Sequence, residues 1–354
     1  AQIYKKKTPD GCSGGPAYYI EEALKSRPLA LVFTGFLIAT FGFGFNMLGS
    51  YNLQSTFSVY GFYDSKTTPW IIGLIVAVIV GYCLLGGGKR MLKVTSVMVP
   101  VMGIAYILVA LLIVVLNIKS LPSVFARILT EAFDFKAIFG GFTGSCVMFG
   151  IKRGLFSNEA GVGSAPNASA SAEVKHPIKQ GLVQVLSVFL DTVLICSATA
   201  FMCMSSGVEP TKELSGAPYV QAALSSAFGD FGPIFITVSM ILFAFTTLLG
   251  NLYYVDQALI YILKKQPSKT FMTVYHIVAS LVIFVGAGLS ADLLWNIADI
   301  TMGGMAIINM PVILYLSKYA FRALKDYDTQ RKAGEEPVFK AKNIGLPHEV
   351  DYWK

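Results

Sequence analysis

The sequence is poor in charge, because Asp, Glu, Lys and Arg together make up only 14% of its 354 residues. A soluble domain usually carries about 25%. The few charges collect in short connectors and leave long stretches almost uncharged, which argues against one large soluble core and for membrane helices. A net charge of +7 suggests a nucleic-acid partner. Since the basic residues lie between apolar runs, we expect the lipid bilayer as partner and no nucleic acid.

Motifs of soluble enzymes are also missing. The chain has no GxxxxGK[ST] loop for nucleotide phosphates, which argues against transport driven by an ATPase of its own. HExxH and GxSxG do not occur, and no nucleophile–base pair or set of metal ligands is visible. The sequence therefore predicts a protein that is not an enzyme and that needs no cofactor.

Long apolar runs dominate what is present. A membrane-spanning helix needs about 20 predominantly apolar residues. Seven runs satisfy this requirement, and an eighth, 137–152, is apolar but short and rich in glycine. The seven runs are 29–58, 70–88, 92–117, 179–206, 231–263, 270–289 and 292–318.

The positions of Lys and Arg predict the orientation of these spans. If all eight segments cross with the N-terminus inside, 23 of the 28 Lys and Arg residues lie on the inner side. That bias collapses if 137–152 does not cross, because Lys264, Lys265 and the basic tail then move outside. We therefore predict a single transmembrane domain with eight crossings between 29 and 318. A cytoplasmic tail, 319–354, follows, and the protein is expected in the cell (inner, plasma) membrane.

The short segment is a functional clue. Gly140, Gly141 and Gly144 weaken a helix there and permit unwound backbone, which survives at membrane depth only where it lines a polar cavity. Close helix packing through Gly140-x-x-x-Gly144 is the alternative. The shortness of the segment and the charge distribution favour a broken, crossing helix.

Polar side chains inside spans are expensive, so each is a candidate for function. Thr246 and Thr247 either bond back to their own helix or supply oxygen ligands to a small hard cation. Asp191, Asp256 and Asp299 are packing partners, gates, or proton or cation sites, with interhelical bonding preferred for Asp191. We expect His276, at the start of a span, to reach toward the membrane interface.

A polar, small-residue stretch follows the broken segment, and in it Arg153 and Glu159 are placed to pair. A cytoplasmic gate and a packed connector are both compatible with its composition. The stretch resembles the signature of the alanine or glycine:cation symporter family, and the resemblance covers almost the whole chain. The residues that carry it are Arg153-Gly154-Leu155-Phe156-Ser157-Asn158-Glu159-Ala160-Gly161, Gly163-Ser164-Ala165-Pro166, His176-Pro177, Gln180-Gly181-Leu182-Val183, Asp191-Thr192 and Gly14-Gly15-Pro16.

The resemblance implies an all-α integral membrane protein of the amino acid–polyamine–cation superfamily. Its LeuT-like fold has two inverted five-helix repeats, each opened by a discontinuous helix. The eight segments would be core helices 3 to 10, with 137–152 as the broken core helix 6. The family's opening Gly-Thr-Gly-Asn stretch and the helix after it do not occur here, so the N-terminal core helices are expected to be missing from this chain.

The same resemblance implies sodium-coupled symport of a small neutral amino acid, alanine or glycine, by alternating access. Sodium is then a co-transported ion rather than a cofactor. Proton coupling on the same scaffold, through Asp191, Asp256 or Asp299, stays open as an alternative. So does a channel or a non-transporting membrane protein.

Site residues follow from fold position and chemistry, in three groups. Substrate would be bound by Gln54, Phe139, Gly140, Gly141, Phe142 and Gly144, with Thr301 and Met305 closing the pocket. Sodium would be held by Thr246 and Thr247. The gate or structural motif would comprise Arg153, Asn158, Glu159 and Asp191.

Overall fold

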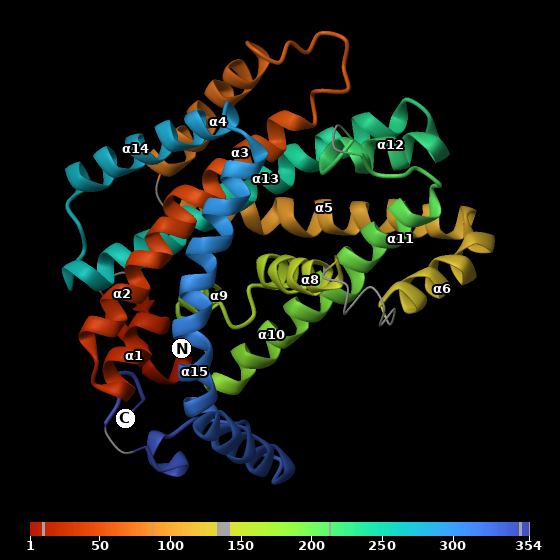
Figure 1. Ribbon diagram of the computed structural model, residues 1–354. Helices are drawn as coiled ribbons and strands as arrows, with labels where there is room; N and C mark the ends of the chain where they lie inside the picture. Colours follow the sequence, from red (N-terminus) through yellow and green to blue (C-terminus); the bar gives the residue numbers. More distant parts are fainter. Residues whose placement is uncertain (9–10, 87, 133–141, 212–213, 347–348, 354) are drawn as a thin grey trace.

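The computed structural model describes residues 1–8, 11–86, 88–132, 142–211, 214–346 and 349–353. These residues are almost entirely helical (Figure 1). The exception is a short antiparallel hairpin near the N-terminus, in which β1 (Lys6–Thr8) pairs with β2 (Gly11–Ser13). The predicted all-helical class is confirmed for the described part of the chain, whereas the inverted-repeat arrangement stays a prediction.

In the described part of the chain, seven helices are long and apolar enough to cross a membrane, and they overlap the seven predicted spans. Two of these spans are composite and contain a π-helical stretch in the middle. The first joins α2 (Arg27–Leu37), η2 (Ile38–Gly44) and α3 (Phe45–Ser55), and the fourth joins α10 (Pro177–Phe189), η4 (Leu190–Cys196) and α11 (Ser197–Ser205). The others are α4 (Thr68–Leu85), α5 (Gly88–Leu116), α13 (Phe231–Leu263), α14 (Lys269–Ala287) and α15 (Ala291–Lys332).

Shorter elements connect the spans. The segment predicted as the eighth crossing is described only from Phe142, where α8 (Phe142–Asn158) begins. The remaining helices are η1 (Gln2–Tyr4), α1 (Pro16–Leu24), η3 (Ile118–Ser120), α6 (Leu121–Ala132), α9 (Ala165–Ala170), α12 (Ala217–Phe228) and η5 (Ala341–Ile344).

Small residues allow the spans to pack closely. α14 contacts both α4 and α3, and Gly286 of α14 lies directly against the backbone of Met47 in α3. Gly73 of α4 makes a similar approach to Ala287. A side chain at either glycine would push the helices apart, so these contacts depend on glycine as they do in other membrane bundles.

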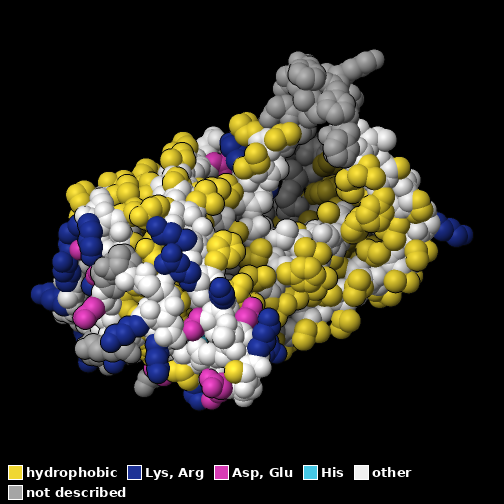
Figure 2. Space-filling view, turned by 90° about the horizontal axis from the view of Figure 1, so that it is seen from below, with side chains coloured by type: hydrophobic (Ala, Val, Ile, Leu, Met, Phe, Trp, Pro, Cys, Tyr) yellow, Lys and Arg dark blue, Asp and Glu magenta, His cyan; other side chains and the backbone are white. Residues whose placement is uncertain are grey.

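Apolar side chains also cover much of the outside. On α4 alone, Ile75, Val78 and Tyr82 are more than half exposed. Viewed from the end that carries the chain termini, hydrophobic side chains extend over a large part of the surface, whereas charged ones gather on one side (Figure 2). An apolar exterior on spans of this length is what a lipid environment requires.

One end of the bundle holds most of the charged and irregular elements, and we call it the charged end. It comprises residues 1–26, the connector 159–176, the α13–α14 loop and the chain after 318. Both chain termini lie there, beside the distal half of α15 (Figure 1). α15 itself continues to Lys332, so the first part of the expected tail is helical.

Candidate functional site

A cavity of about 440 Å³ lies among the spans, bounded by α3, α5, η4, α11, α12, α13 and α15. Its volume falls within the range of small-molecule sites, about 300–1,000 Å³. Most of its wall is apolar, and a few polar side chains interrupt it. The residues that line it include Asn52, Asp191, Thr199, Ser239, Phe243 and Trp295.

Arg153 ties α8 to the wall of this cavity. Its guanidinium donates to the carboxylate of Asp299 in α15 and lies 3.9 Å from the ring centroid of Trp295. Lys152 is also within reach of Asp299, at 3.3 Å between Nζ and Oδ2. A planar guanidinium can pair with a carboxylate and stack on an aromatic ring at once. The expected pairing of Arg153 with Glu159 is therefore wrong, because Asp299 takes that place.

The end of α8 is also joined to the π-helical stretch η4. The Ser157 hydroxyl donates to Asp191 Oδ2 over 2.6 Å, and Asn158 Nδ2 donates to Thr192 Oγ1 over 3.2 Å. Asp191, which borders the cavity, therefore bonds between helices, as preferred for it from the sequence. The signature residues of α8 thus connect α15 on one side with η4 on the other.

Glu159 stands where α8 ends, in left-handed backbone with φ of 53°. It accepts a hydrogen bond from the Ser164 hydroxyl, five residues later. Low-polarity surroundings raise the pKa of Glu159 to about 7, and the negative charge of Asp191 adds to the rise, while the Ser164 bond opposes it. Glu159 is therefore a carboxyl that gains and loses its proton near neutral pH.

Asn309 of α15 joins several elements of the charged end, next to the turn that follows Glu159. Its side chain accepts from the Tyr19 hydroxyl of α1 and donates to the Gly161 carbonyl over 2.9 Å. Gly163, with φ of 100°, lies so close to Asn309 and Phe33 that no side chain fits there. The Tyr19–Asn309 contact is buried and the Asn309–Gly161 contact is partly buried, so α1, α2, α15 and the connector meet in one closely packed layer. We call this layer the inner closure and define it by Tyr19, Phe33, Gly161, Gly163 and Asn309.

The two predicted sodium ligands differ in their surroundings. Thr246 is buried, and its hydroxyl donates to the carbonyls of Leu242 and Phe243 of its own helix, at 3.0 and 3.1 Å. This is the back-bonding expected of helical threonine, and it leaves oxygen lone pairs available. Thr247 is exposed, one turn beyond Phe243, which borders the cavity.

The predicted substrate residues are dispersed. Gln54 is buried and accepts from the Tyr63 hydroxyl over 2.8 Å. Thr301 donates to the Ile297 carbonyl over 2.9 Å and faces η2, whereas Met305 is fully enclosed in the core. None of these three side chains lines the described cavity.

The glycine-rich segment is only partly described. Phe139, Gly140 and Gly141 lie outside the described residues. Phe142 and Gly144 are in α8, so the backbone at Gly144 is helical rather than unwound, contrary to expectation.

Several connecting residues were not foreseen. Asn309 and Trp295 did not stand out in the sequence, although an Asn in an apolar run is itself a signal. Asn251 Nδ2 donates to Asn46 Oδ1 over 3.0 Å and joins α13 to α3 in the core. His276, expected at the interface, is buried instead with Nε2 3.6 Å from Asp256 Oδ1.

The described residues form seven membrane-length helices, five of which contribute to the wall of a cavity that carries a few polar side chains, and this defines a multi-pass membrane protein. The chain belongs to the sodium:alanine symporter family, whose model matches residues 1–341. It is 40% identical over 354 residues to the amino-acid carrier protein AlsT of Bacillus subtilis, covering 100% of this chain and 74% of that one.

Two further relatives carry names that mention the transported species. The probable sodium/glutamine symporter GlnT of Bacillus subtilis is 40% identical over 354 residues, covering 100% of this chain and 72% of that protein. The sodium/alanine symporter AgcS of Methanococcus maripaludis is 36% identical over 325 residues, covering 90% of this chain and 70% of that protein.

Proposed function

We propose that this protein carries out sodium-coupled symport of a small neutral amino acid, with alanine or glycine as substrate. The observation that carries the proposal is the family match over residues 1–341. The cavity among the spans supports it, because about 440 Å³ is ample for a small zwitterion. Moving one positive charge inward gains about 2.3 kcal/mol per 100 mV, so the membrane potential assists sodium-driven uptake.

The proposed scaffold is the LeuT-like inverted repeat, with the eight segments as core helices 3 to 10. Seven membrane-length helices in the expected order support it. In this scheme the substrate lies against main-chain groups near Gly140, Gly141 and Gly144. Phe139 or Phe142 limits the size of its side chain.

The remaining substrate contacts are assigned by position in the fold. Gln54 hydrogen-bonds the substrate, and Thr301 and Met305 close the pocket. Thr246 and Thr247 coordinate sodium through hydroxyl oxygens, the ligand type that a hard cation prefers.

The proposed orientation places the charged end in the cytoplasm of a cell whose plasma membrane holds the protein. The excess of Lys and Arg at this end supports the assignment. Arg153, Asn158, Glu159 and Asp191 then act at the cytoplasmic side as the gate motif. Their bonds to α15, η4 and Ser164 would have to change when the substrate leaves toward the inside.

The direct test is uptake of labelled alanine by the purified protein in liposomes. We expect accumulation against a gradient when sodium is high outside, and none when potassium replaces sodium. Unlabelled glycine should compete, and glutamine serves as the larger competitor. Uptake driven by a pH gradient without sodium would favour proton coupling, and flux that never saturates would favour a channel.

A further inference from the structure

The chain after α15 folds back over the charged end, and we call residues 337–346 and 349–353 the tail segment. Trp353 is buried and donates from Nε1 to the Gln2 carbonyl over 2.8 Å. Phe339 donates from its backbone nitrogen to the Lys175 carbonyl over 3.0 Å, and its ring meets that of Trp353 edge-on at 5.2 Å. The tail segment therefore contacts both the N-terminal residues and the connector 159–176.

The N-terminal residues in turn contact the connector. Gln2 Nε2 donates to the carbonyls of Ser169 and Ala172, at 2.6 and 2.9 Å. Lys5 is fully buried, donates to the Ala172 carbonyl over 2.9 Å, and lies 4.0 Å from the ring centroid of Tyr352. A buried ammonium needs such partners. Loss of the Tyr352 ring would therefore expose Lys5 to solvent and weaken its contact with the connector.

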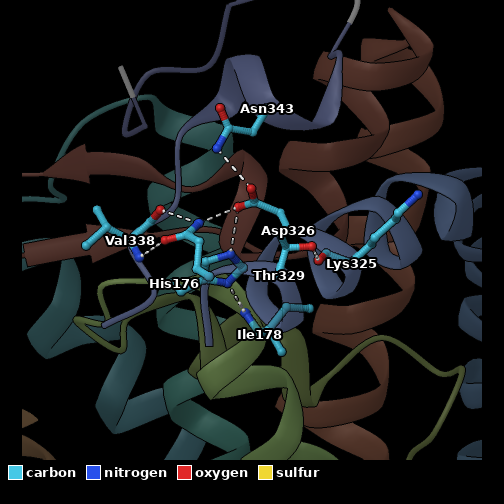
Figure 3. A network of polar contacts seen from close by, with 8 residues as sticks. His176, Ile178, Lys325, Asp326, Thr329, Val338 and Asn343 are labelled. Atoms are coloured by element: carbon cyan, nitrogen blue, oxygen red, sulfur yellow. Dashed lines mark hydrogen bonds and ion pairs between the residues drawn. The ribbon is translucent and has the colours of Figure 1, made fainter. Parts of the chain in front are cut away.

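A polar network fixes the tail segment to α15 (Figure 3). His176 is buried, and its Nδ1 accepts from the Ile178 backbone nitrogen, so Nε2 carries the proton toward Asp326 at 3.3 Å. Asn343 donates to the other oxygen of Asp326 over 2.9 Å. The carboxylate of Asp326 thus joins the connector, α15 and the tail segment at one point.

Gln330, one turn farther along α15, completes the network. Its side chain donates to Asp326 over 2.9 Å and both accepts from and donates to the backbone of Val338, at 2.9 and 3.1 Å. The side chain of Val338 itself is exposed. The attachment therefore runs through the Val338 backbone and leaves its side chain free to be changed.

The connector held in this way is the one that forms the inner closure. Its first part carries Gly161 and Gly163 against Asn309, and its last part carries His176. α1, which supplies Tyr19 to Asn309, follows the N-terminal residues that Trp353 holds, after the hairpin of β1 and β2. Opening the inner closure requires the connector and α1 to separate from α15, and the tail segment spans all three.

We infer that the tail segment is a clasp that holds the inner closure shut, with Trp353, Phe339 and Asn343 as its positioning residues. The inference rests on the proposed function, because it makes opening of the inner closure a step of transport. Weakening the clasp shifts the population toward the inward-open form. Only the outward-facing form takes up external substrate. The apparent affinity of the protein for that substrate therefore falls in proportion to the population of the outward-facing form.

The test combines a thiol reporter with transport kinetics in the full chain. Val162→Cys places a thiol at a fully buried position of the connector, beside the inner closure, with Cys12, Cys83, Cys146, Cys196 and Cys203 replaced by Ser. On this background Trp353→Ala should raise the rate of maleimide labelling from the inner side about tenfold. Trp353→Phe should raise it by less, because phenylalanine still places an aromatic ring at this position. Val338→Ala is the matched control in the same segment and should leave the rate unchanged.

Uptake separates a clasp from a merely structural role. Trp353→Ala should raise KM for external alanine while kcat stays the same or rises, whereas simple loss of folded protein lowers kcat at constant KM. Asn343→Ala provides a second variant from the other end of the tail segment, in case Trp353→Ala does not fold. Unchanged labelling in both variants, or an equal change in Val338→Ala, overturns the clasp. Absence of alanine uptake by the unmodified protein instead overturns the proposed function, and the labelling result stays interpretable.

Discussion

Arg153 and Asp299 form an ion pair between α8 and α15, covered on one side by the ring of Trp295. Asp299 is mostly buried, with 11% of its side chain exposed, whereas Arg153 is exposed by about a third. The pair thus lies at the boundary between the cavity wall and the signature stretch. It holds α8 against α15.

Breaking this pair should destabilise the protein. Asp299→Asn leaves Arg153 and Lys152 side by side without their carboxylate, and we expect a loss of about 1–2 kcal/mol in the free energy of unfolding. Thermal unfolding in detergent measures it. Glu131→Gln is the control, because its pair with Arg127 is exposed to solvent and should contribute little to stability. Equal effects of the two substitutions would contradict the role of Asp299.

Sodium dependence should identify the cation ligands. Thr247→Ala should raise the sodium concentration for half-maximal uptake about tenfold, equivalent to about 1.4 kcal/mol of binding. Thr247→Ser keeps the hydroxyl and should restore most of the affinity. Thr273→Ala serves as control, because Thr273 is an exposed threonine of α14 that donates to the Lys269 carbonyl. An unchanged sodium requirement in Thr247→Ala would refute the assignment.

The Asp256–His276 pair should act as a unit within the membrane. His276→Leu leaves the Asp256 carboxyl, of which 20% is exposed, without its neighbour 3.6 Å away, and we expect the melting temperature to fall. Adding Asp256→Asn removes the charge as well, so the double variant should recover a large part of the loss. Melting temperatures of the two single variants and the double variant measure the coupling. Strictly additive losses would mean that the two side chains do not depend on each other.

Glu159 should make stability depend on pH. Its pKa in the fold is about 7 against an ordinary value of 4.5, so the unfolded chain releases this proton first as the pH rises. The free energy of unfolding then falls between about pH 4.5 and 7 relative to Glu159→Gln, and the difference levels off above pH 7. Melting curves of both proteins from pH 5 to 8 measure it. Parallel curves throughout this range would show that Glu159 does not retain its proton in the fold.

The spans were predictable because their signal is local. Twenty apolar residues in sequence determine a crossing regardless of their neighbours, and all seven such runs form membrane-length helices. The interruptions of the first and fourth spans by η2 and η4 were not predictable in this way. A π-helical turn depends on what packs beside it, and the sequence of a single span does not contain that information.

The contacts between site residues were harder to predict than the residues themselves. Arg153 was expected to matter, but its partner Asp299 lies 146 residues away, beyond the reach of local pattern. The nearer Glu159 was preferred only because it was close in the sequence. The chain after 318 was predicted simply as a cytoplasmic tail. Its attachment runs from the Trp353 indole to the Gln2 carbonyl and from the Asn343 amide to the Asp326 carboxylate, partners that are distant in the sequence and that no local residue pattern indicates.

The π-helical stretches η2 and η4 give two of the spans a wide turn near the middle, with seven residues each. A π turn holds about one residue more than an α turn, and one residue corresponds to about 100° of rotation about the helix axis. If such a turn tightens, the half of the span beyond it swivels while the other half stays in place. A span with such a stretch can therefore rotate one half about the helix axis relative to the other half, without tilting as a whole.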